Sequence, residues 1–391
     1  MTRSFDEVID RVGTHSVKWD DCESLYGVNP REGISMWVAD MDFRPPHAVI
    51  DALQDAVNHG VFGYFGNDAP YKDAITGWMK RRHGWEVDPS WISTTHGLVA
   101  AVGLCLQALT KPGDGIILFT PVYHAFAKMI NANDRMVVES ELAMENGQYQ
   151  LNLAALEASL IGNERMILFC SPHNPGGRVW SVAELNALAD FAAKHDLMLV
   201  SDEIHHDLVF VGHQHQVLQK LRPDLNDRLV TLTAASKTFN LAGGMTGNVI
   251  IPDPALRARF AKVHLAAGAS PNRFGILMTT AAYTDGEAWL DEAVAYIDDN
   301  RQLFDAGINA IPGLKSMDMG STYLAWVDFS GTGMSRDKFT ARVQKQAKIA
   351  ANHGPTFGTG GESYMRFNLA TPRSYVEEAV ARMQKAFADL Q

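Results

Sequence analysis

Short apolar runs alternate with stretches of helical periodicity over the first two thirds of the chain. Runs of this kind, bounded by glycine or polar loops, are typical of buried strands in a parallel sheet. The predicted strands are residues 91–95, 115–120, 135–139, 166–170, 197–202, 229–233 and 247–251. The predicted helices include residues 46–60, 71–83, 98–109 and 184–195. The pattern therefore predicts an α/β fold with a mostly parallel sheet, helices on both faces and right-handed crossovers.

The pattern changes after residue 285. Residues 322–328 and 364–370 alternate between apolar and polar positions, as half-buried strands do. Three further helices are predicted, at residues 287–310, 337–348 and 374–390. We therefore expect a large ligand-binding domain (46–285), a small α+β C-terminal domain (286–391) and an irregular N-terminal segment (1–45). The N-terminal segment should pack with the small domain.

Length and charge narrow the class of protein. A chain of 391 residues suits a large α/β domain with a smaller partner, and its net charge of −11 argues against a nucleic-acid partner or an anionic membrane surface. No apolar run could span a bilayer, and the polar N-terminus shows no signal peptide. Cys22, Cys105 and Cys170 lie far apart without CxxC spacing, so we expect no disulfide framework, no metal site and a cytoplasmic location.

Polar residues follow three of the predicted strands directly. Asn174 lies in the loop after the 166–170 strand, Asp202 ends the 197–202 strand, and Lys237 follows the 229–233 strand. Because parallel strands end at one edge of a sheet, we expect these side chains to meet there. The strand–glycine–helix turn at Gly97 should bring helix N–H groups, which favour anions, to the same edge.

The combination of groups points to one ligand. A phosphate would accept from the N–H groups of Gly97, Leu98 and Val99, and Tyr123 could stack on a flat ring. Asp202 could pair with a protonated ring nitrogen, Asn174 could donate to a ring oxygen, and Lys237 could bond to an aldehyde. Pyridoxal 5'-phosphate needs all of these groups. Taken singly, each residue could instead have an ordinary structural role. Gly97 and Asn174 could be turn residues, Asp202 a helix cap, Tyr123 a core aromatic and Lys237 a surface lysine. We expect His205 and His206 to be ordinary polar residues rather than metal ligands.

Several segments resemble the signature segments of one enzyme family. These are residues 11–20 (RVGTHSVKWD), 36–43 (MWVADMDF), 171–180 (SPHNPGGRVW), 201–208 (SDEIHHDL), 236–243 (SKTFNLAG), 357–361 (FGTGG) and 366–373 (RFNLATPR). They are similar to those of fold-type I pyridoxal-phosphate enzymes, the aspartate aminotransferase superfamily. More narrowly, they resemble its MalY/PatB-like cystathionine β-lyase branch, and the likeness runs almost from end to end.

The resemblance implies a role for each site residue. Lys237 would hold the cofactor covalently, and Asp202 would keep the pyridine nitrogen protonated. Asn174 would bond the ring 3-oxygen, while Tyr123 would cover the ring face. The backbone of residues 97–99, with Ser236, would bind the phosphate.

Two further residues gain roles only from the resemblance. Arg366 would bind the substrate carboxylate, for which a bidentate guanidinium is well shaped. Tyr64 would reach the phosphate of the neighbouring subunit, so a homodimer is expected. Trp37, Tyr323 and His205 are candidates for the pocket that receives the substrate side chain, although a purely structural role is as good a reading of each.

The chain departs from the wider superfamily at three positions. Met245 stands where many aminotransferases have a phosphate-binding arginine, eight residues after the lysine. Ala234 stands where many relatives have a hydroxyl, and Ser171 stands where asparagine is commoner. The missing arginine favours the lyase branch and leaves the phosphate to be held more by backbone than by side chains.

The implied activity is β-elimination from an amino acid with sulfur at Cβ, such as cystathionine or another cysteine S-conjugate. The products would be pyruvate, ammonia and a thiol. An aminotransferase is the first alternative, because it uses the same constellation of residues. A pyridoxal-phosphate-containing regulator that acts through a partner protein is the second alternative.

Overall fold

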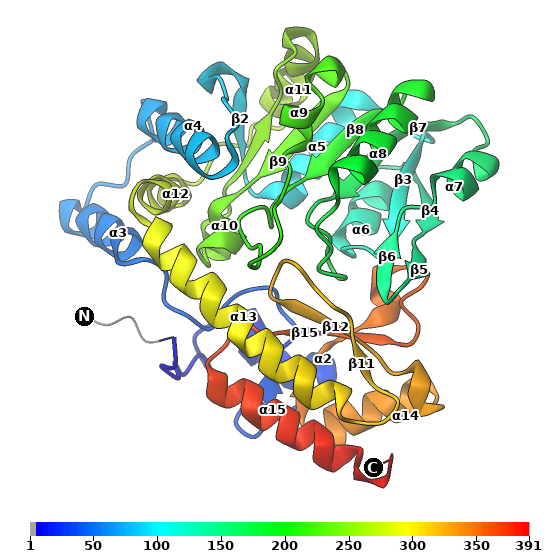
Figure 1. Cartoon of the computed structure of the whole chain (residues 1–391). Helices are drawn as coiled ribbons and strands as arrows, with labels where there is room; N and C mark the ends of the chain where they lie inside the picture. Colours follow the sequence, from blue (N-terminus) through cyan, green and yellow to red (C-terminus); the bar gives the residue numbers. More distant parts are fainter. Residues whose placement is uncertain (1–4, 391) are drawn as a thin grey trace.

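A seven-stranded sheet fills one half of the molecule, the upper half in Figure 1. The computed structural model describes residues 5–390, so residues 1–4 of the predicted N-terminal segment and residue 391 of the predicted C-terminal domain lie outside the described residues. In spatial order the strands are β2 (Ile92–Thr95), β10 (Gly247–Ile250), β9 (Leu229–Thr233), β8 (Met198–Asp202), β7 (Glu164–Cys170), β3 (Gly115–Thr120) and β4 (Met136–Glu141). Strand β10 runs antiparallel to both neighbours, and the other adjacent pairs are parallel. The predicted, mostly parallel sheet is confirmed.

Helices cover both faces of this sheet, as the apolar strands require. Along β3, Ile116 and Leu118 point to one face, while Ile117 and Phe119 point to the other. The first face packs against α5 (Leu98–Leu109), α6 (Ala125–Ala132) and α11 (Pro254–Ala266). The second packs against α7 (Leu153–Ser159), α8 (Val182–Lys194) and α9 (Leu218–Leu221). Because both faces are covered, the inner strands β3, β9 and β10 are buried throughout, whereas the edge strand β4 is largely exposed.

A second, antiparallel sheet occupies the other half of the molecule. Its spatial order is β11 (Lys315–Ser316), β12 (Leu324–Asp328), β15 (Tyr364–Asn368) and β14 (Asn352–His353). The long helix α13 (Glu287–Asn309) lies beside α15 (Arg373–Ala386) and crosses between the two halves (Figure 1). Helix α14 (Arg336–Ala341) completes this half.

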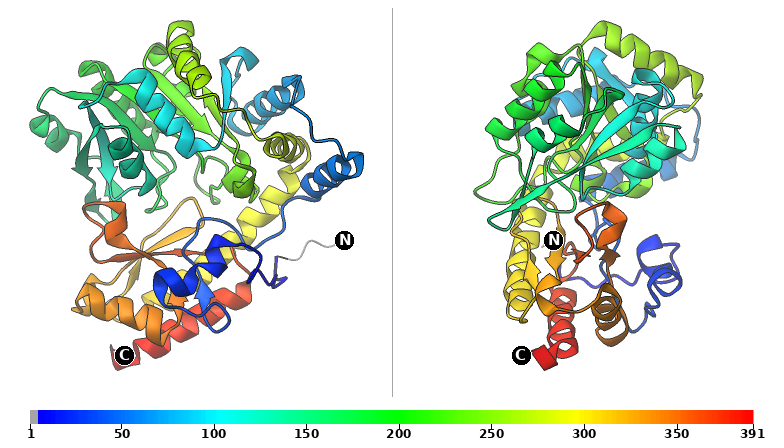
Figure 2. Two further views of the ribbon diagram at one scale, coloured as in Figure 1. Left: turned by 180° about the vertical axis from the view of Figure 1, so that it is seen from behind. Right: turned by 90° about the vertical axis from the view of Figure 1, so that its right-hand side faces the viewer.

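The N-terminal segment lies on the same half as the second sheet (Figure 2). It contains two short helices, α1 (Val17–Asp20) and α2 (Cys22–Tyr26), and its strand β1 (Ile34–Ser35) pairs in parallel with β13 (Ile349–Ala350). The division at residues 45 and 285 remains a proposal, supported by this pairing and by the break between α12 (Arg273–Asp285) and α13.

Several elements differ from the sequence-based expectation. The helices α1, α2, α7, α9, α10 (Ala235–Thr238), α11 and α12 and the hairpin of β5 (Ala143–Glu145) and β6 (Gln148–Gln150) were not predicted. The predicted helix 337–348 is α14 followed by a wider π turn at Arg342–Gln346, and the predicted helix 374–390 ends in a separate short turn.

The remaining α-helices of the described residues are α3 (His47–His59) and α4 (Ala69–His83). Among the described residues, no helix is long and apolar enough to cross a membrane.

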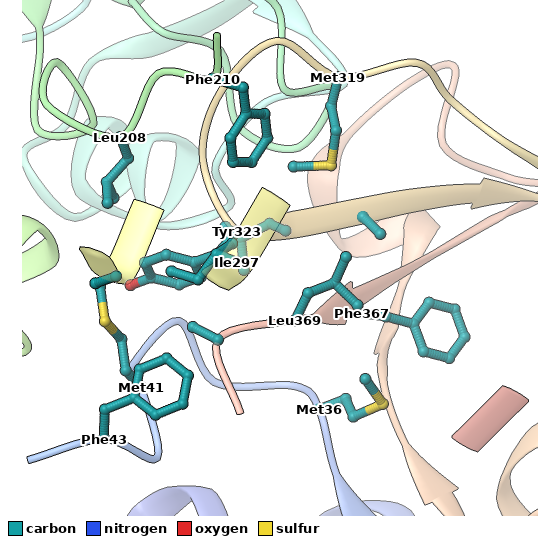
Figure 3. Close-up of a cluster of buried hydrophobic side chains, with 14 of the residues drawn as sticks. Met36, Met41, Phe43, Leu208, Phe210, Ile297, Met319, Tyr323, Phe367 and Leu369 are labelled. Atoms are coloured by element: carbon teal, nitrogen blue, oxygen red, sulfur yellow. The ribbon is translucent and has the colours of Figure 1, made fainter. Parts of the chain in front are cut away.

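Buried side chains from distant parts of the chain meet where the two halves join (Figure 3). Met36, Met41 and Phe43 come from the N-terminal segment and pack with side chains of the loop after β8, of α13 and of the second sheet. This packing fixes residues 36–43 against the edge at which β7, β8 and β9 end.

Candidate active site

The ends of β7, β8 and β9 are aligned at one edge of the large sheet. Cys170 lies opposite Asp202, and Asp202 lies opposite Leu232. The loops that follow therefore leave the sheet side by side. They form one wall of a cavity of about 470 Å³ whose lining includes Gly97, Leu98, Val99, Tyr123, Asn174, Asp202, Ser236 and Lys237. The fold thus brings together all the predicted cofactor-contacting residues except Tyr64.

Lys237 extends into this cavity from the short helix α10. Its Nζ donates to the carbonyl oxygen of Ala39, 2.7 Å away, and no carboxylate of residues 5–390 lies within 4.0 Å of it. Burial lowers the pKa of Lys237 to about 8, with Arg366 acting in the same direction and Asp40 and Asp202 opposing it. A substantial share of the amine is therefore neutral near pH 7–8, which is the form that attacks an aldehyde.

Asp202 is buried at the end of β8. Its Oδ1 accepts from the backbone N–H of Ile204 at 3.1 Å, and in the described part of the chain no cationic side chain lies within 4.0 Å. Burial raises the pKa of Asp202 to about 7. The carboxyl group thus lacks the positive partner that a buried carboxylate needs, and a cationic ring nitrogen would supply one.

Arg366 bonds to Asn174, a residue of the cavity lining, from the opposite half of the molecule. Nη1 of Arg366 donates to Oδ1 of Asn174 at 3.0 Å, and Nη2 donates to Oδ1 of Asn352 at 2.6 Å and to the carbonyl oxygen of Trp37 at 2.9 Å. The guanidinium also lies 4.9 Å from the ring centre of Phe357. Because its carbonyl oxygen faces Arg366, the Asn174 amide leaves its NH₂ group free to donate elsewhere.

The guanidinium of Arg366 is buried without a negative partner. Only 2% of its surface is exposed, its Nε has no hydrogen-bond partner, and within residues 5–390 no carboxylate lies within 4.0 Å. Burial lowers its pKa to about 10. A buried cation of this kind requires an anion. The carboxylate of a bound amino acid would meet that need.

The opposite end of the cavity is built for an anion. Gly97 has a φ of 81°, a left-handed conformation that favours glycine, and it precedes the first turn of α5. Residues 96–100 line the cavity, so the free N–H groups of this helix end face its interior. Ser236 and Met245 also line it, in agreement with a phosphate site that has no arginine at position 245.

Tyr64 lies apart from this cavity within a single chain. It is fully exposed, on a loop that lines a separate hollow of about 690 Å³ together with Phe62 and Arg273. Its predicted role therefore requires a second copy of the chain.

The three candidates for the substrate pocket are placed differently. His205 lines the cavity, is buried, and has an Nδ1 without a hydrogen-bond partner. The hydroxyl of Tyr323 donates to the same Ala39 carbonyl oxygen that Lys237 uses, at 2.9 Å. Trp37 contributes its backbone carbonyl to Arg366, while its Nε1 donates to the carbonyl oxygen of Lys18.

Sequence reasoning missed Ala39 and Asn352, which hold Lys237 and Arg366 through a carbonyl and an amide oxygen. It also missed His124, a half-buried ring 5.0 Å from Tyr123 and 5.7 Å from Phe357. The motif at residues 36–43 contains Ala39 and was the available signal for it. Nothing local marks Asn352.

Comparison with known proteins agrees with this geometry. Residues 31–383 match the family model for class I and II aminotransferases. The chain belongs to this family. It is 38% identical to cystathionine beta-lyase PatB from Bacillus subtilis (strain 168), over 98% of this chain and 100% of that protein, and 32% identical to protein MalY from Escherichia coli (strain K12), over 98% of each. The crystal structure of cystalysin from Treponema denticola, which contains a pyridoxal 5'-phosphate cofactor, superposes with a TM-score of 0.95 at 38% identity and covers 100% of both chains.

The residues that line this cavity fit pyridoxal phosphate, which is the cofactor that class I and II aminotransferases require. An amine with a lowered pKa, a buried carboxyl group without a cation and a helix N-terminus line one cavity of about 470 Å³. Each group has a counterpart on the cofactor: the aldehyde, the ring nitrogen and the phosphate. The fold-type I architecture expected from the sequence is confirmed by the family match and by the superposition.

Proposed function

We propose that the protein is a pyridoxal-phosphate-dependent carbon–sulfur β-lyase that acts on cystathionine or another cysteine S-conjugate. The supporting observation is that a chain similar to a cystathionine beta-lyase over its whole length has Lys237 and Asp202 in the lining of one cavity, with Arg366 bonded to Asn174 of the same lining. The products would be pyruvate, ammonia and a thiol.

Arg366 would hold the amino-acid substrate by its carboxylate. Its guanidinium is oriented by Asn174 and Asn352, which occupy some of its donors but leave Nε unpaired. The two amide oxygens are neutral, so the positive charge stays available to the substrate. The carboxylate would thereby be fixed while Cα faces Lys237.

Lys237 would then accept the Cα proton. Bound pyridoxal phosphate supplies a cationic ring that withdraws the electrons left at Cα, so that the bond from Cβ to sulfur can break. Burial lowers the pKa of the Lys237 amine to about 8, so a share of it is neutral at physiological pH, as a proton acceptor requires. The carbonyl oxygen of Ala39 holds Nζ when it is not engaged with substrate or cofactor.

The other residues would position the cofactor. Asp202 would pair with the ring nitrogen, the free NH₂ of Asn174 would donate to the ring oxygen, and Tyr123 would cover one ring face. The N-terminus of α5 and Ser236 would bind the phosphate. His205, Tyr323 and Trp37 would border the space for the leaving sulfur group.

The proposal is tested with L-cystathionine and no keto acid. Pyruvate and free thiol should appear in equal amounts, and the purified protein should show cofactor absorbance. Cofactor absorbance with neither product from cystathionine, cystine or other S-conjugates would contradict the proposal.

An aminotransferase is the second candidate, favoured by the family model that matches residues 31–383. It would share the role of Lys237 at Cα but return the proton to the cofactor instead of losing a group from Cβ. Amino transfer that appears only after a keto acid is added, without pyruvate from cystathionine, would identify it.

We also propose a homodimer, with Tyr64 acting in the neighbouring subunit, and a cytoplasmic location. The exposed apolar loop with Val61, Phe62 and Tyr64 supports the dimer, and three buried, unpaired cysteines suit a reducing compartment. A mixture of Tyr64→Ala and Lys237→Ala subunits tests the dimer, since hybrid dimers regain one intact site. Activity no higher than that of either variant alone would contradict it.

A further inference from the structure

A second group of polar side chains lies behind the cavity. His83 ends α4, and His206 and Asp207 follow β8, so three potential ligands come from two distant parts of the chain. One donor atom from each lies within 4.8 Å of the others, and no other such group of three occurs within residues 5–390. We propose that His83, His206 and Asp207 form a binding site for a divalent transition-metal ion of the Zn²⁺ class.

The protonation of His206 is the first argument for a cation. Its Nδ1 lies 2.5 Å from the carbonyl oxygen of Glu203, and a carbonyl oxygen can only accept, so Nδ1 carries the hydrogen. In a neutral ring, Nε2 then has a lone pair. This atom is buried, makes no hydrogen bond and lies 3.1 Å from Oδ2 of Asp207. A lone pair this close to a carboxylate oxygen needs a positive charge beside it, which either a second proton on the ring or a bound metal ion would supply.

The carboxylate of Asp207 is already oriented by donors outside the cluster. Trp78 Nε1 lies 3.1 and 3.2 Å from its two oxygens, and Thr238 Oγ1 donates to Oδ2 at 2.8 Å. The bonds from Trp78 and Thr238 are of the kind that orient metal ligands from outside. Within the cluster, Nε2 of His83 lies 2.8 Å from Oδ1, and bonds from both atoms to the ion would replace this contact.

The ligand types select the metal. Two imidazole nitrogens and one carboxylate suit Zn²⁺ or a neighbouring transition ion, whereas Mg²⁺ and Ca²⁺ prefer oxygen ligands alone. The three side chains border a hollow of about 270 Å³, from which water could occupy a fourth position.

Charged groups at the rim do not oppose a cation. Arg82 pairs with Glu287 and Asp291, and Arg81 lies 3.7 Å from Glu287, so their charges are compensated. His215, which also borders the hollow, is engaged with the carboxylate of Glu203 at 2.8 Å. It would support the site from outside rather than bind the ion.

The site would be coupled to the cavity through two short links. Thr238, which donates to Asp207, is the residue after Lys237, and His205, which lines the cavity, is the residue before His206. A bound ion would stabilise the folded protein by mass action. It would also fix the positions of Thr238 and His205 relative to Asp207 and His206. The sequence alone favours ordinary polar roles for these histidines, because the approach of His83 is visible only in the fold.

Zinc titration of the holoenzyme tests the proposal. Untagged protein loaded with cofactor and stripped of metal should bind about one Zn²⁺ per chain, measured by calorimetry with zinc chloride, and should give no comparable signal with magnesium chloride. His206→Asn and His83→Gln should each weaken zinc binding by at least roughly 10–100-fold.

His195→Asn is the matched control, because His195 also contacts a carboxylate, that of Glu157 at 3.0 Å, but lies outside the cluster. It should bind zinc as the wild type does, and retained cofactor absorbance would show that each variant is folded. Absence of zinc binding in the wild type, or equal binding in the wild type and both cluster variants, would overturn the proposal.

Discussion

Two lysines of this molecule, the buried Lys18 and the half-buried Lys237, have opposite surroundings. Lys18 is 0% exposed, and its Nζ lies 2.6 Å from Oδ2 of Asp42. Asp42 also accepts from Arg11 at 2.7 Å and from Trp19 Nε1 at 3.0 Å. Burial alone would raise the pKa of Asp42, but Lys18 and Arg11 lower it below its ordinary value. Every charge in this cluster has a partner.

Three ionisable groups at or beside the cavity lack such partners: the half-buried Lys237 and the buried Asp202 and Arg366. Burial moves the pKa of each toward its neutral form, down for Lys237 and Arg366 and up for Asp202. The first cluster holds two parts of the N-terminal segment together, residues 11–19 and Asp42. The second leaves its charges available to a ligand, and it does so at a cost in stability. The difference predicts which substitutions will affect activity and which will affect folding.

The largest effect is expected from Lys237→Ala. Loss of the proton acceptor alone should lower the rate of pyruvate release from cystathionine by roughly 10²–10⁴-fold. The melting temperature should not fall, because Nζ has no charged partner within residues 5–390. Turnover near the wild-type value, or clear thermal destabilisation of the variant, would show that Lys237 contributes to stability, as Lys18 does, rather than to catalysis.

Asp42→Asn should give the opposite result. It leaves Lys18 and Arg11 without their buried partner, and breaking a buried ion pair costs about 3–5 kcal/mol. Urea unfolding should therefore show a much lower free energy of unfolding, while the protein that remains folded keeps its cofactor absorbance. A loss below about 1 kcal/mol, typical of surface pairs, would contradict this reading.

The sequence predicts the two regions unequally, for physical reasons. Asp202 and Lys237 each follow a strand with a strong local signal, so their common edge follows from the parallel sheet alone. The roles of Arg366 and Tyr64 came only from the resemblance to a family. The Ala39 carbonyl, Asn352 and the Lys18–Asp42 pair depend on contacts between distant segments, which no periodicity encodes.

The missed helices have a similar explanation. Helices α1 and α2 are only four and five residues long, and such short helices depend on tertiary packing rather than on local preference. Helix α12 contains Gly275, whose backbone packs against Gly244 with no room for a side chain. Its glycine weakens the helical signal in the sequence, and the reason for the glycine is visible only in the fold.

A smaller effect is expected from Arg366→Lys. An ammonium group would keep the charge but lose the paired donors, at a cost of about 1.5–3 kcal/mol, or roughly 10–100-fold in kcat/KM, mainly through KM. Arg373→Lys is the control, because this half-exposed arginine pairs with Asp299 at 3.4 Å. Equal changes in KM for the two variants would remove the argument for a carboxylate site at Arg366.

The pH dependence of cofactor binding sharpens the comparison further. Because the pKa of Lys237 is about 8, the neutral amine increases from a minor fraction at pH 7 to the major form at pH 9. The rate at which apo-protein bonds covalently to pyridoxal phosphate, followed by absorbance, should rise through about pH 8 and then level off. A midpoint near the ordinary lysine pKa of about 10.4 would show that burial does not act on this amine.

Asp40 touches both regions, so its substitution gives the smallest and most discriminating change. It pairs with Arg11 at 2.7 Å, and its charge raises the pKa of Lys237 against the larger effect of burial. Asp40→Asn should therefore move the midpoint of the binding profile to lower pH, because the protonated amine loses a nearby negative charge. The same variant should lose no more than about 1 kcal/mol of stability, since the Arg11–Asp40 pair is partly exposed. A fall in stability with an unchanged midpoint would show that Asp40 acts only in the Lys18–Asp42 cluster, and that burial, Arg366 and Asp202 set the pKa of Lys237 without it.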